Sequence, residues 1–462
     1  MNSKKIVYPY IPNSEPQVQK EMLQEIGVNS INELFTDIPE KLLLHKKMNL
    51  PKPFLSEYEL KRHIESILSK NSTCKENISF LGAGCWQHYV PAVVDEVIHR
   101  SEFLTAYAGE PYEDHGRFQV LFEYASMMGD MLEMDVVSIP TYDWSQAAST
   151  SLRMSCRITG RDEVIVSKTI NPDRLLVIKN YCNPNVNVVM LDFDSKTGMA
   201  DINNLEKKIS NKTAGVYIEN PSYLGSIESN GAKLSEIIHK AGALFLVGVD
   251  PSSLGVLTPP INYGADIVCG DLQPLGIHMN YGGGVAGFIA TRDEKEFVSE
   301  YPSRLFGIAP TENSEWGFGD VMWERTSFAN RESSKEFVGT AAALWGIAAG
   351  VYLAVMGPEG MQELGKGIIQ RSLYAQKEIG KIKGVKVPVL QSANYCEFVV
   401  DFNNSGKTIK EINKTLLKKG IFGGKGLSKD FPQFGQSALY CVTEIHSKED
   451  IDRLVFALKE VF

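Results

Sequence analysis

The chain has 462 residues, of which 43% are hydrophobic and 22% are charged, and its formal net charge is −9. A chain of this length exceeds what one hydrophobic core organises, so we expect a globular protein with two or three structural units. The net acidity argues against a nucleic-acid or anionic-membrane partner, because both surfaces carry negative charge.

The cysteine and histidine patterns predict neither disulfides nor a metal site. The seven cysteines never form a Cys-x-x-Cys pair, and the eight histidines show no His-x-x-x-His spacing. Free thiols and the lack of an apolar stretch of signal-peptide length predict a cytoplasmic protein. The longest apolar run, residues 340–356, is shorter than the roughly 20 residues of a membrane helix, so we expect a buried helix there.

Residues 1–75 are predicted to form an N-terminal helical arm. The capping box Ser56-x-x-Glu59 marks the start of one helix, because each side chain can bond an unpaired backbone amide at a helix start. An apolar stripe follows at helical spacing. The stripe consists of Leu60, Ile64 and Leu68.

Residues 76–340 are predicted to form a large α/β domain. Short apolar runs alternate here with helix-length stretches, which is typical of βαβ units and a mostly parallel sheet. The runs are 164–166, 188–191, 215–218, 244–249, 267–268 and 287–290. Residues 341–356 are expected to form a connecting helix, and 357–462 a small C-terminal α/β domain with antiparallel strands.

The segment Gly282–Gly287 matches the dinucleotide fingerprint Gly-x-Gly-x-x-Gly. That motif requires a helix immediately after it, whereas here the predicted strand 287–290 follows. We therefore interpret it as a glycine-rich turn.

A polar and aromatic loop precedes the first predicted strand of the large domain. Such a density of hydrogen-bonding groups in a loop favours a binding surface, although a solvated loop with structural aromatics is the alternative. The candidate contact residues are Tyr107, Glu110, Tyr112, His115 and Arg117.

Several long runs resemble the P-proteins of the glycine cleavage system, the glycine dehydrogenases (decarboxylating). Within that family the chain is similar to subunit 1 of organisms that split the protein in two, the homologue of its N-terminal half. The matching runs include 8–14 (YPYIPNS), 31–39 (INELFTDIP), 55–63 (LSEYELKRH), 273–277 (QPLGI) and 357–360 (GPEG).

The resemblance implies a fold-type-I pyridoxal-phosphate (PLP) transferase architecture, like that of aspartate aminotransferase. In the split enzymes the cofactor lysine belongs to subunit 2. At the corresponding place this chain has Gln273 or Pro274, neither of which can form a Schiff base. The expected phosphate cup begins at Trp144 and Ser145, where an indole replaces the family's glycine and obstructs close backbone approach.

The leading hypothesis is a subunit that carries no PLP and pairs with a PLP-bearing subunit 2, as a heterotetramer. The pair would decarboxylate glycine and pass the aminomethyl group to the lipoyl arm of the H-protein, and this chain alone would be inactive. Segments 108–115 and 324–337 depart from the family pattern and leave the substrate open. The alternatives are a stand-alone PLP enzyme using Lys168 or Lys233, and a regulatory pseudo-enzyme.

Overall fold

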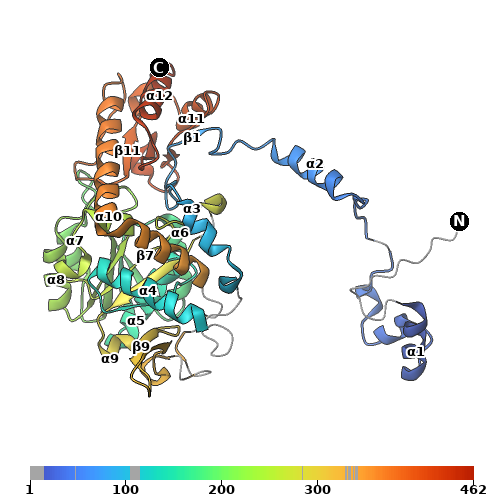
Figure 1. The fold of residues 1–462 in the computed structure, drawn as a ribbon. Helices are drawn as coiled ribbons and strands as arrows, with labels where there is room; N and C mark the ends of the chain where they lie inside the picture. Colours follow the sequence, from blue (N-terminus) through green and yellow to red (C-terminus); the bar gives the residue numbers. More distant parts are fainter. Residues whose placement is uncertain are drawn as a thin grey trace. The chain divides into compact units, whose positions relative to one another are not determined.

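The computed structural model describes residues 15–46, 48–104, 115–282, 285–327, 330, 334–336, 338 and 342–462. The chain divides into two units, Met1–Ser72 and Thr73–Phe462 (Figure 1).

The first unit consists of short helices without a core of their own. Its helices are α1 (Pro16–Ile26), η1 (Ile31–Phe35), η2 (Glu40–Leu42) and α2 (Glu57–Leu68). One half of the capping box predicted at Ser56 forms, since the Ser56 hydroxyl accepts a hydrogen bond from the Glu59 amide at 3.4 Å. No described residue of this unit is buried.

The second unit is built on a seven-stranded sheet. Five adjacent strands run parallel to one another, β8 pairs with them in the antiparallel sense, and the edge strand β2 pairs antiparallel with β8. The order is β2 (Val136–Val137), β8 (Gly287–Thr291), β7 (Ile267–Asp271), β6 (Leu244–Val249), β5 (Thr213–Glu219), β3 (Glu163–Ser167) and β4 (Asn187–Leu191). Each predicted run became a strand, so the mostly parallel α/β sheet is confirmed.

Helices cover this sheet and connect its strands. The helix α5 packs against β5, β7 and β8, and α4 packs against α10. The helices up to β9 are α3 (Ala92–Ile98), α4 (His115–Leu132), α5 (Trp144–Thr159), α6 (Pro172–Cys182), α7 (Ile202–Lys208), α8 (Gly231–Lys240) and α9 (Lys295–Val298). A hairpin of β9 (Phe306–Pro310) and β10 (Trp316–Asp320) follows.

The long helix α10 (Ala343–Ile379) leads from the sheet to the C-terminal elements (Figure 1). The helix α10 continues past residue 356, where the connecting helix was predicted to end. Gly357 interrupts the helical conformation with φ 59° and ψ 179°, and Pro358 follows in a position that suits a helix start. Two helical segments therefore join here at a kink. The predicted boundaries at residues 340 and 357 stay predictions.

The C-terminal elements form a three-stranded antiparallel sheet with two helices. The strand order is β11 (Glu397–Asp401), β14 (Ser437–Cys441) and β13 (Lys425–Gly426), and the helices are α11 (Ile409–Leu417) and α12 (Lys448–Lys459). A strand from far upstream joins them, because β1 (Ile78–Ser79) pairs in parallel with β12 (Ile421–Phe422). Among the described residues, no helix is both long enough and apolar enough to cross a membrane.

Candidate functional site

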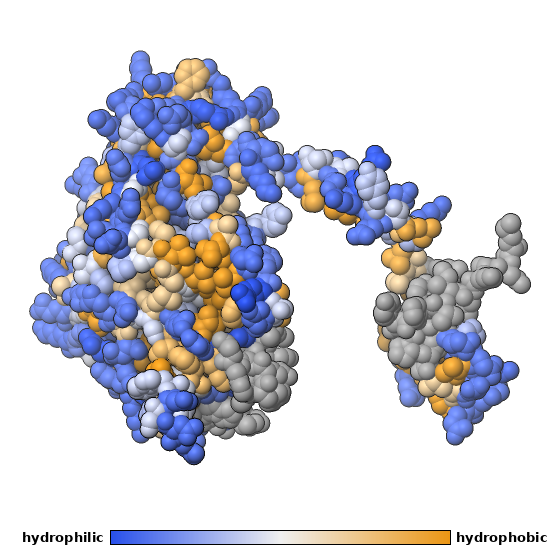
Figure 2. All heavy atoms as spheres, viewed as in Figure 1, coloured by the Kyte–Doolittle hydropathy of each residue, from blue (hydrophilic) through white to orange (hydrophobic). Residues whose placement is uncertain are grey.

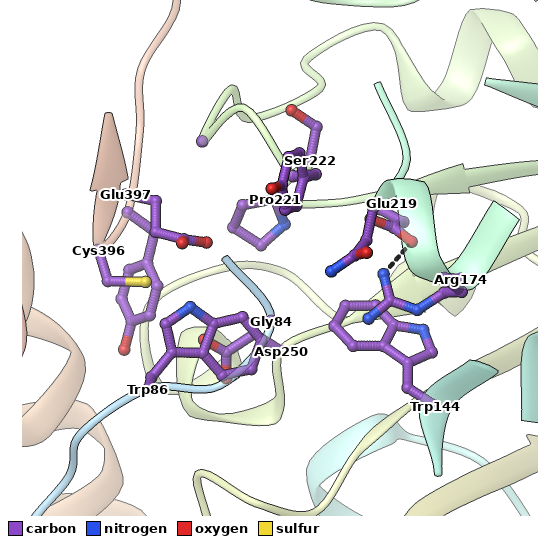
Figure 3. A pocket seen from close by; sticks show the side chains of 14 residues that line it. Gly84, Trp86, Trp144, Arg174, Glu219, Pro221, Ser222, Asp250, Cys396 and Glu397 are labelled. Carbon is purple, nitrogen blue, oxygen red and sulfur yellow. Dashed lines mark hydrogen bonds and ion pairs between the residues drawn. The ribbon is translucent and has the colours of Figure 1, made fainter. Parts of the chain in front are cut away.

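A small buried cavity lies where the carboxyl ends of the parallel strands meet the C-terminal elements (Figure 3). Its wall includes Glu219 from the end of β5, Asp250 directly after β6 and Glu397 at the start of β11. Ligands bind at this edge in open α/β sheets. The cavity volume is about 20 Å³. By the same measure, one water molecule needs roughly 10–15 Å³.

A buried ion pair and an indole close one side of the cavity. The guanidinium of Arg174, from α6, binds the carboxylate of Glu219, and both side chains are almost fully buried (Figure 3). The same guanidinium stacks on Trp144, 3.7 Å from the ring centroid, and the indole Nε1 donates to the Tyr217 hydroxyl at 3.0 Å. Burial disfavours a charged Arg174, but the attraction of Glu219 keeps its pKa above the usual range.

Asp250 is the carboxylate best placed to meet a ligand. It is 4% exposed. Its Oδ1 accepts from the Ser252 amide at 2.9 Å and the Ser252 hydroxyl at 2.7 Å. Its Oδ2 has no hydrogen-bond partner among the described residues. Burial raises the pKa of Asp250, and an aspartate is one of the usual partners of a PLP ring nitrogen.

Two further carboxyl groups are buried near the ends of these strands. Glu397 accepts from the Ala83 amide at 2.5 Å, and burial raises its pKa to about 7. Asp271, the last residue of β7, accepts from the Gln273 amide at 2.8 Å, and burial likewise raises its pKa to about 7. Both groups therefore favour the protonated form at neutral pH far more than free carboxyls do.

The predicted position of the cofactor lysine is occupied by Gln273, whose side-chain amide is hydrogen-bonded at both its nitrogen and its oxygen. Gln273 lies two residues after β7 and is 1% exposed. Its Nε2 donates to the carbonyls of Trp86 at 2.9 Å and Ile277 at 3.0 Å, and its Oε1 accepts from the Trp86 amide at 3.1 Å. Pro274 beside it is also buried. These bonds fix the segment around Trp86 against the turn that follows β7.

The predicted phosphate cup is occupied by the chain's own groups. Trp144 is the first residue of α5 and is 4% exposed. The carboxylate of Asp143 caps this helix by accepting from the Gln146 amide at 2.6 Å. An anion bound at this helix start would meet a negative charge and a bulky indole. Ser145 is partly buried, and its carbonyl accepts from the Ser149 hydroxyl at 2.6 Å.

The residues present do not fit PLP. Asp250 could face a ring nitrogen, but no lysine lines the cavity in the described part of the chain. Asp143 and Trp144 fill the phosphate end, and the cavity holds about 20 Å³, which suits a water rather than a substituted pyridine ring.

The alternative lysines lie away from the cavity wall. Lys168 forms an ion pair with Asp192, and 47% of its side chain is exposed. Lys233 is an exposed residue of α8. Neither contributes to the wall of the cavity.

The predicted loop site is only partly within the described structure. Tyr107, Glu110 and Tyr112 lie outside the described residues. His115 is the first residue of α4, and its side chain also lies outside them. Arg117 is in α4 and is 3% exposed. The role of the five candidates therefore stays a prediction.

Several cavity residues were missed by the sequence analysis. Glu219 and Asp250 follow apolar runs that were assigned as strands, so the rule that ligands meet strand ends could have flagged both. Arg174, Trp86 and Glu397 come from segments distant in sequence. No local pattern marks them.

The fold is that of the fold-type-I PLP enzymes. A sphingosine-1-phosphate lyase from Burkholderia pseudomallei superposes with a TM-score of 0.64 at 15% identity, covering 91% of this chain and 92% of that one. A cysteine desulfurase from Escherichia coli gives 0.61 at 14% identity, covering 84% and 96%. At these identities the likeness concerns the fold alone.

Matches of higher sequence similarity show the family of the chain. The family model of the glycine cleavage system P-protein matches residues 8–458. The chain belongs to the P-protein family. A crystal structure of an inhibitor-bound glycine decarboxylase (P-protein) superposes with a TM-score of 0.85 at 30% identity, covering 98% of this chain and all of that one.

Curated relatives indicate which kind of P-protein chain this one resembles. A probable glycine dehydrogenase (decarboxylating) subunit 1 from Staphylothermus marinus is 38% identical over 98% of both chains. One with the same name from Pyrococcus furiosus is 39% identical over 98% of this chain and 99% of its own. The predicted resemblance and fold class are confirmed.

Proposed function

We propose that this chain is the subunit of a two-subunit P-protein that carries no PLP. Together with a PLP-bearing subunit 2 it would decarboxylate glycine and transfer the aminomethyl group to the lipoyl arm of the H-protein. The supporting observation is the cavity, where Gln273 replaces a lysine and where Asp143 and Trp144 fill the phosphate end. The names of the curated relatives, subunit 1, agree with a partner subunit.

In this proposal the chain contributes scaffold and contact surface rather than cofactor chemistry. The hydrogen bonds of Gln273 and the Arg174–Glu219 ion pair join side chains to one another around the cavity where a cofactor-binding relative would hold PLP. The residues that we expect to line the partner's active site are Tyr107, Glu110, Tyr112, His115 and Arg117. Single substitutions there should lower turnover of the assembled enzyme without preventing assembly.

The proposed assembly is a heterotetramer in a reducing compartment such as the cytoplasm. All seven cysteines are within the described residues, and all are free thiols. Disulfides are common in secreted proteins and rare in cytosolic ones. Free thiols therefore support the cytoplasmic assignment.

Co-expression with a subunit 2 from the same organism tests the proposal. The purified complex should exchange the carboxyl carbon of glycine with bicarbonate when lipoylated H-protein is added, and neither subunit alone should do so. A complex that forms without exchange of glycine would favour a regulatory role or another substrate.

The stand-alone alternative is tested on the isolated chain. PLP added to the chain should produce no visible absorption band, and borohydride should fix no PLP to the protein. A band, followed by mass spectrometry that locates PLP on Lys168 or Lys233, would overturn the proposal.

A further inference from the structure

The wall of the buried cavity carries more acidic than basic groups. Of the described residues that line it, Glu219, Asp250 and Glu397 are acidic, and Arg174 alone is basic. Arg174 forms its ion pair with Glu219, so the described wall supplies no cation for the other two carboxyl groups. Figure 2 shows mostly hydrophilic residues over the visible outside of the C-terminal elements, where water solvates charged groups. Asp250 and Glu397 are 4% and 5% exposed, and buried charges in proteins need a partner.

One oxygen of Asp250 is free to bind a ligand. The amide and hydroxyl of Ser252 both donate to Oδ1, whereas Oδ2 is buried and has no hydrogen-bond partner among the described residues. The hydroxyl groups of Ser222 and Tyr223, which line the same cavity, are buried and likewise have no partner there. Leaving such groups unbonded costs stability, and native proteins usually satisfy them with water or an ion. The cavity therefore offers a ligand one carboxylate oxygen and two hydroxyl oxygens.

The surroundings of Asp250 do not neutralise it. His88 attracts its negative charge and Glu444 repels it, and these two side chains are bonded to each other at 2.8 Å, so their effects oppose each other. The charge of Asp250 also acts on the buried carboxyl groups of Glu397 and Asp271. A cation in the cavity would relieve this repulsion, which a neutral water molecule would not.

The size and the aromatic wall of the cavity select the kind of cation. Its volume of about 20 Å³ admits a ligand close to the size of a water molecule, and an ammonium ion has that size. The rings of Trp86 and Tyr395 line the cavity, and aromatic faces attract ammonium groups. In the described part of the chain, no group of three or more His, Cys, Asp or Glu side chains could hold a metal ion. An ammonium ion needs only hydrogen-bond acceptors.

We propose that this cavity is a binding site for a small protonated amine, ammonium or methylammonium. Its N–H groups donate to Oδ2 of Asp250 and to the hydroxyl oxygens of Ser222 and Tyr223, while Glu397 supplies a second acidic group. All of these residues belong to the unit Thr73–Phe462. The inference therefore goes beyond the proposed function and does not depend on it: the site would bind its ligand in a chain that forms no complex with subunit 2.

Calorimetric titration of the full-length chain with ammonium chloride, with sodium chloride keeping the ionic strength constant, tests the site. Ammonium should bind, methylammonium should bind as well, and tetramethylammonium should not, because its four methyl groups exceed the cavity. Potassium is similar in size to ammonium but donates no hydrogen bond, so it should bind more weakly. No ammonium binding, or equal binding of potassium or tetramethylammonium, would overturn the inference.

A matched pair of variants locates the site. Asp250→Asn keeps the shape of the side chain but removes the carboxylate, and it should weaken ammonium binding by roughly ten- to a hundredfold, as expected for losing one charge-assisted hydrogen bond. Asp130→Asn makes the same replacement at an exposed position of α4 outside the cavity wall, and it should leave the affinity unchanged. Ammonium binding by Asp250→Asn at the affinity of wild type would overturn the assignment.

A milder variant covers the case in which Asp250→Asn does not fold. Ser222→Ala removes one hydroxyl acceptor and should weaken ammonium binding by roughly two- to tenfold, as expected for a neutral hydrogen bond. Urea unfolding in ammonium-free buffer shows which variants are folded. Ammonium labelled with nitrogen-15 gives a direct measurement, because a buried ion should show its own NMR signal with slowly exchanging protons. Unchanged affinity in folded Ser222→Ala, together with no such signal for wild type, would contradict the proposal.

Discussion

The imidazole Nδ1 of His88 lies 2.8 Å from the Oε2 of Glu444, although the two residues are 356 positions apart in the sequence. The other carboxylate oxygen of Glu444 accepts from the Tyr89 amide at 2.7 Å. Burial disfavours a charged His88, but the attraction of Glu444 and, to a lesser extent, of Asp250 more than offsets this effect and raises the pKa of the imidazole. The pair fastens the segment before α3 to the turn before α12.

Replacing Glu444 with Gln should destabilise the chain in a pH-dependent way. The raised pKa of His88 contributes stability that is fully present below the unfolded value near 6.5 and is lost as pH rises through the folded value. We expect Glu444→Gln to lower the free energy of unfolding by roughly 1–3 kcal/mol at pH 6. The loss should be smaller at pH 9. Urea unfolding at both pH values checks this, with the exposed Glu449→Gln as control.

Breaking the buried Arg174–Glu219 pair should cost more than removing it altogether. Arg174→Met leaves the Glu219 carboxylate buried without its cation, and such a loss typically costs about 3–5 kcal/mol. The double variant Arg174→Met/Glu219→Met should recover much of that stability, because no uncompensated charge remains. Chemical unfolding of the three proteins measures this coupling. Equal stability of the single and double variants would contradict the interpretation.

Restoring a lysine alone should not restore the cofactor site. In Gln273→Lys the Asp143 carboxylate still caps α5 and Trp144 still fills the phosphate end. We expect no visible absorption band with PLP, and lower stability, because an ammonium replaces an amide that makes three hydrogen bonds. The exposed Gln119→Lys is the matched control. Stoichiometric PLP binding by Gln273→Lys would show that the cup is open.

Asp271 should make the chain less stable as pH rises toward neutrality. Burial raises its pKa from 3.8 to about 7, so the folded state binds more protons than the unfolded state between these values. Stability therefore falls across this window and levels off above pH 7. Asp271→Asn cannot ionise and should be more stable than wild type at pH 8 by on the order of 2–4 kcal/mol. Urea unfolding at pH 5 and pH 8 should show a clearly larger difference at the higher pH.

The sheet could be predicted because its strands are locally distinct. The run 244–249, for example, is a short apolar segment that follows Gly242 and ends at the polar Asp250, and it forms β6 with the predicted bounds. The kink in α10 lies beside a predicted helix end. The connecting helix was predicted to end at residue 356, and the structure interrupts the helical conformation at Gly357, after which a second helical segment continues to Ile379.

Only one feature of the cavity, the lack of a cofactor lysine, could be predicted from the sequence. The absence of a lysine near residue 273 is visible in the sequence, but the bonds that hold Gln273 join it to Trp86, 187 positions away. Likewise, Arg174 reaches Glu219 across 45 positions. Such contacts depend on how the sheet brings strand ends together, and that arrangement is not encoded in any one segment.

The pairing of β1 with β12 has a consequence for how the chain folds. Ile78 lies beside Ile421, and Phe80 is fully buried among the C-terminal elements. During synthesis, Phe80 leaves the ribosome long before its neighbours exist, so this part of the core cannot close until almost the whole chain has been made. Contacts of such high sequence separation slow folding. Until then the nascent chain exposes an aromatic side chain, a site at which a chaperone could bind.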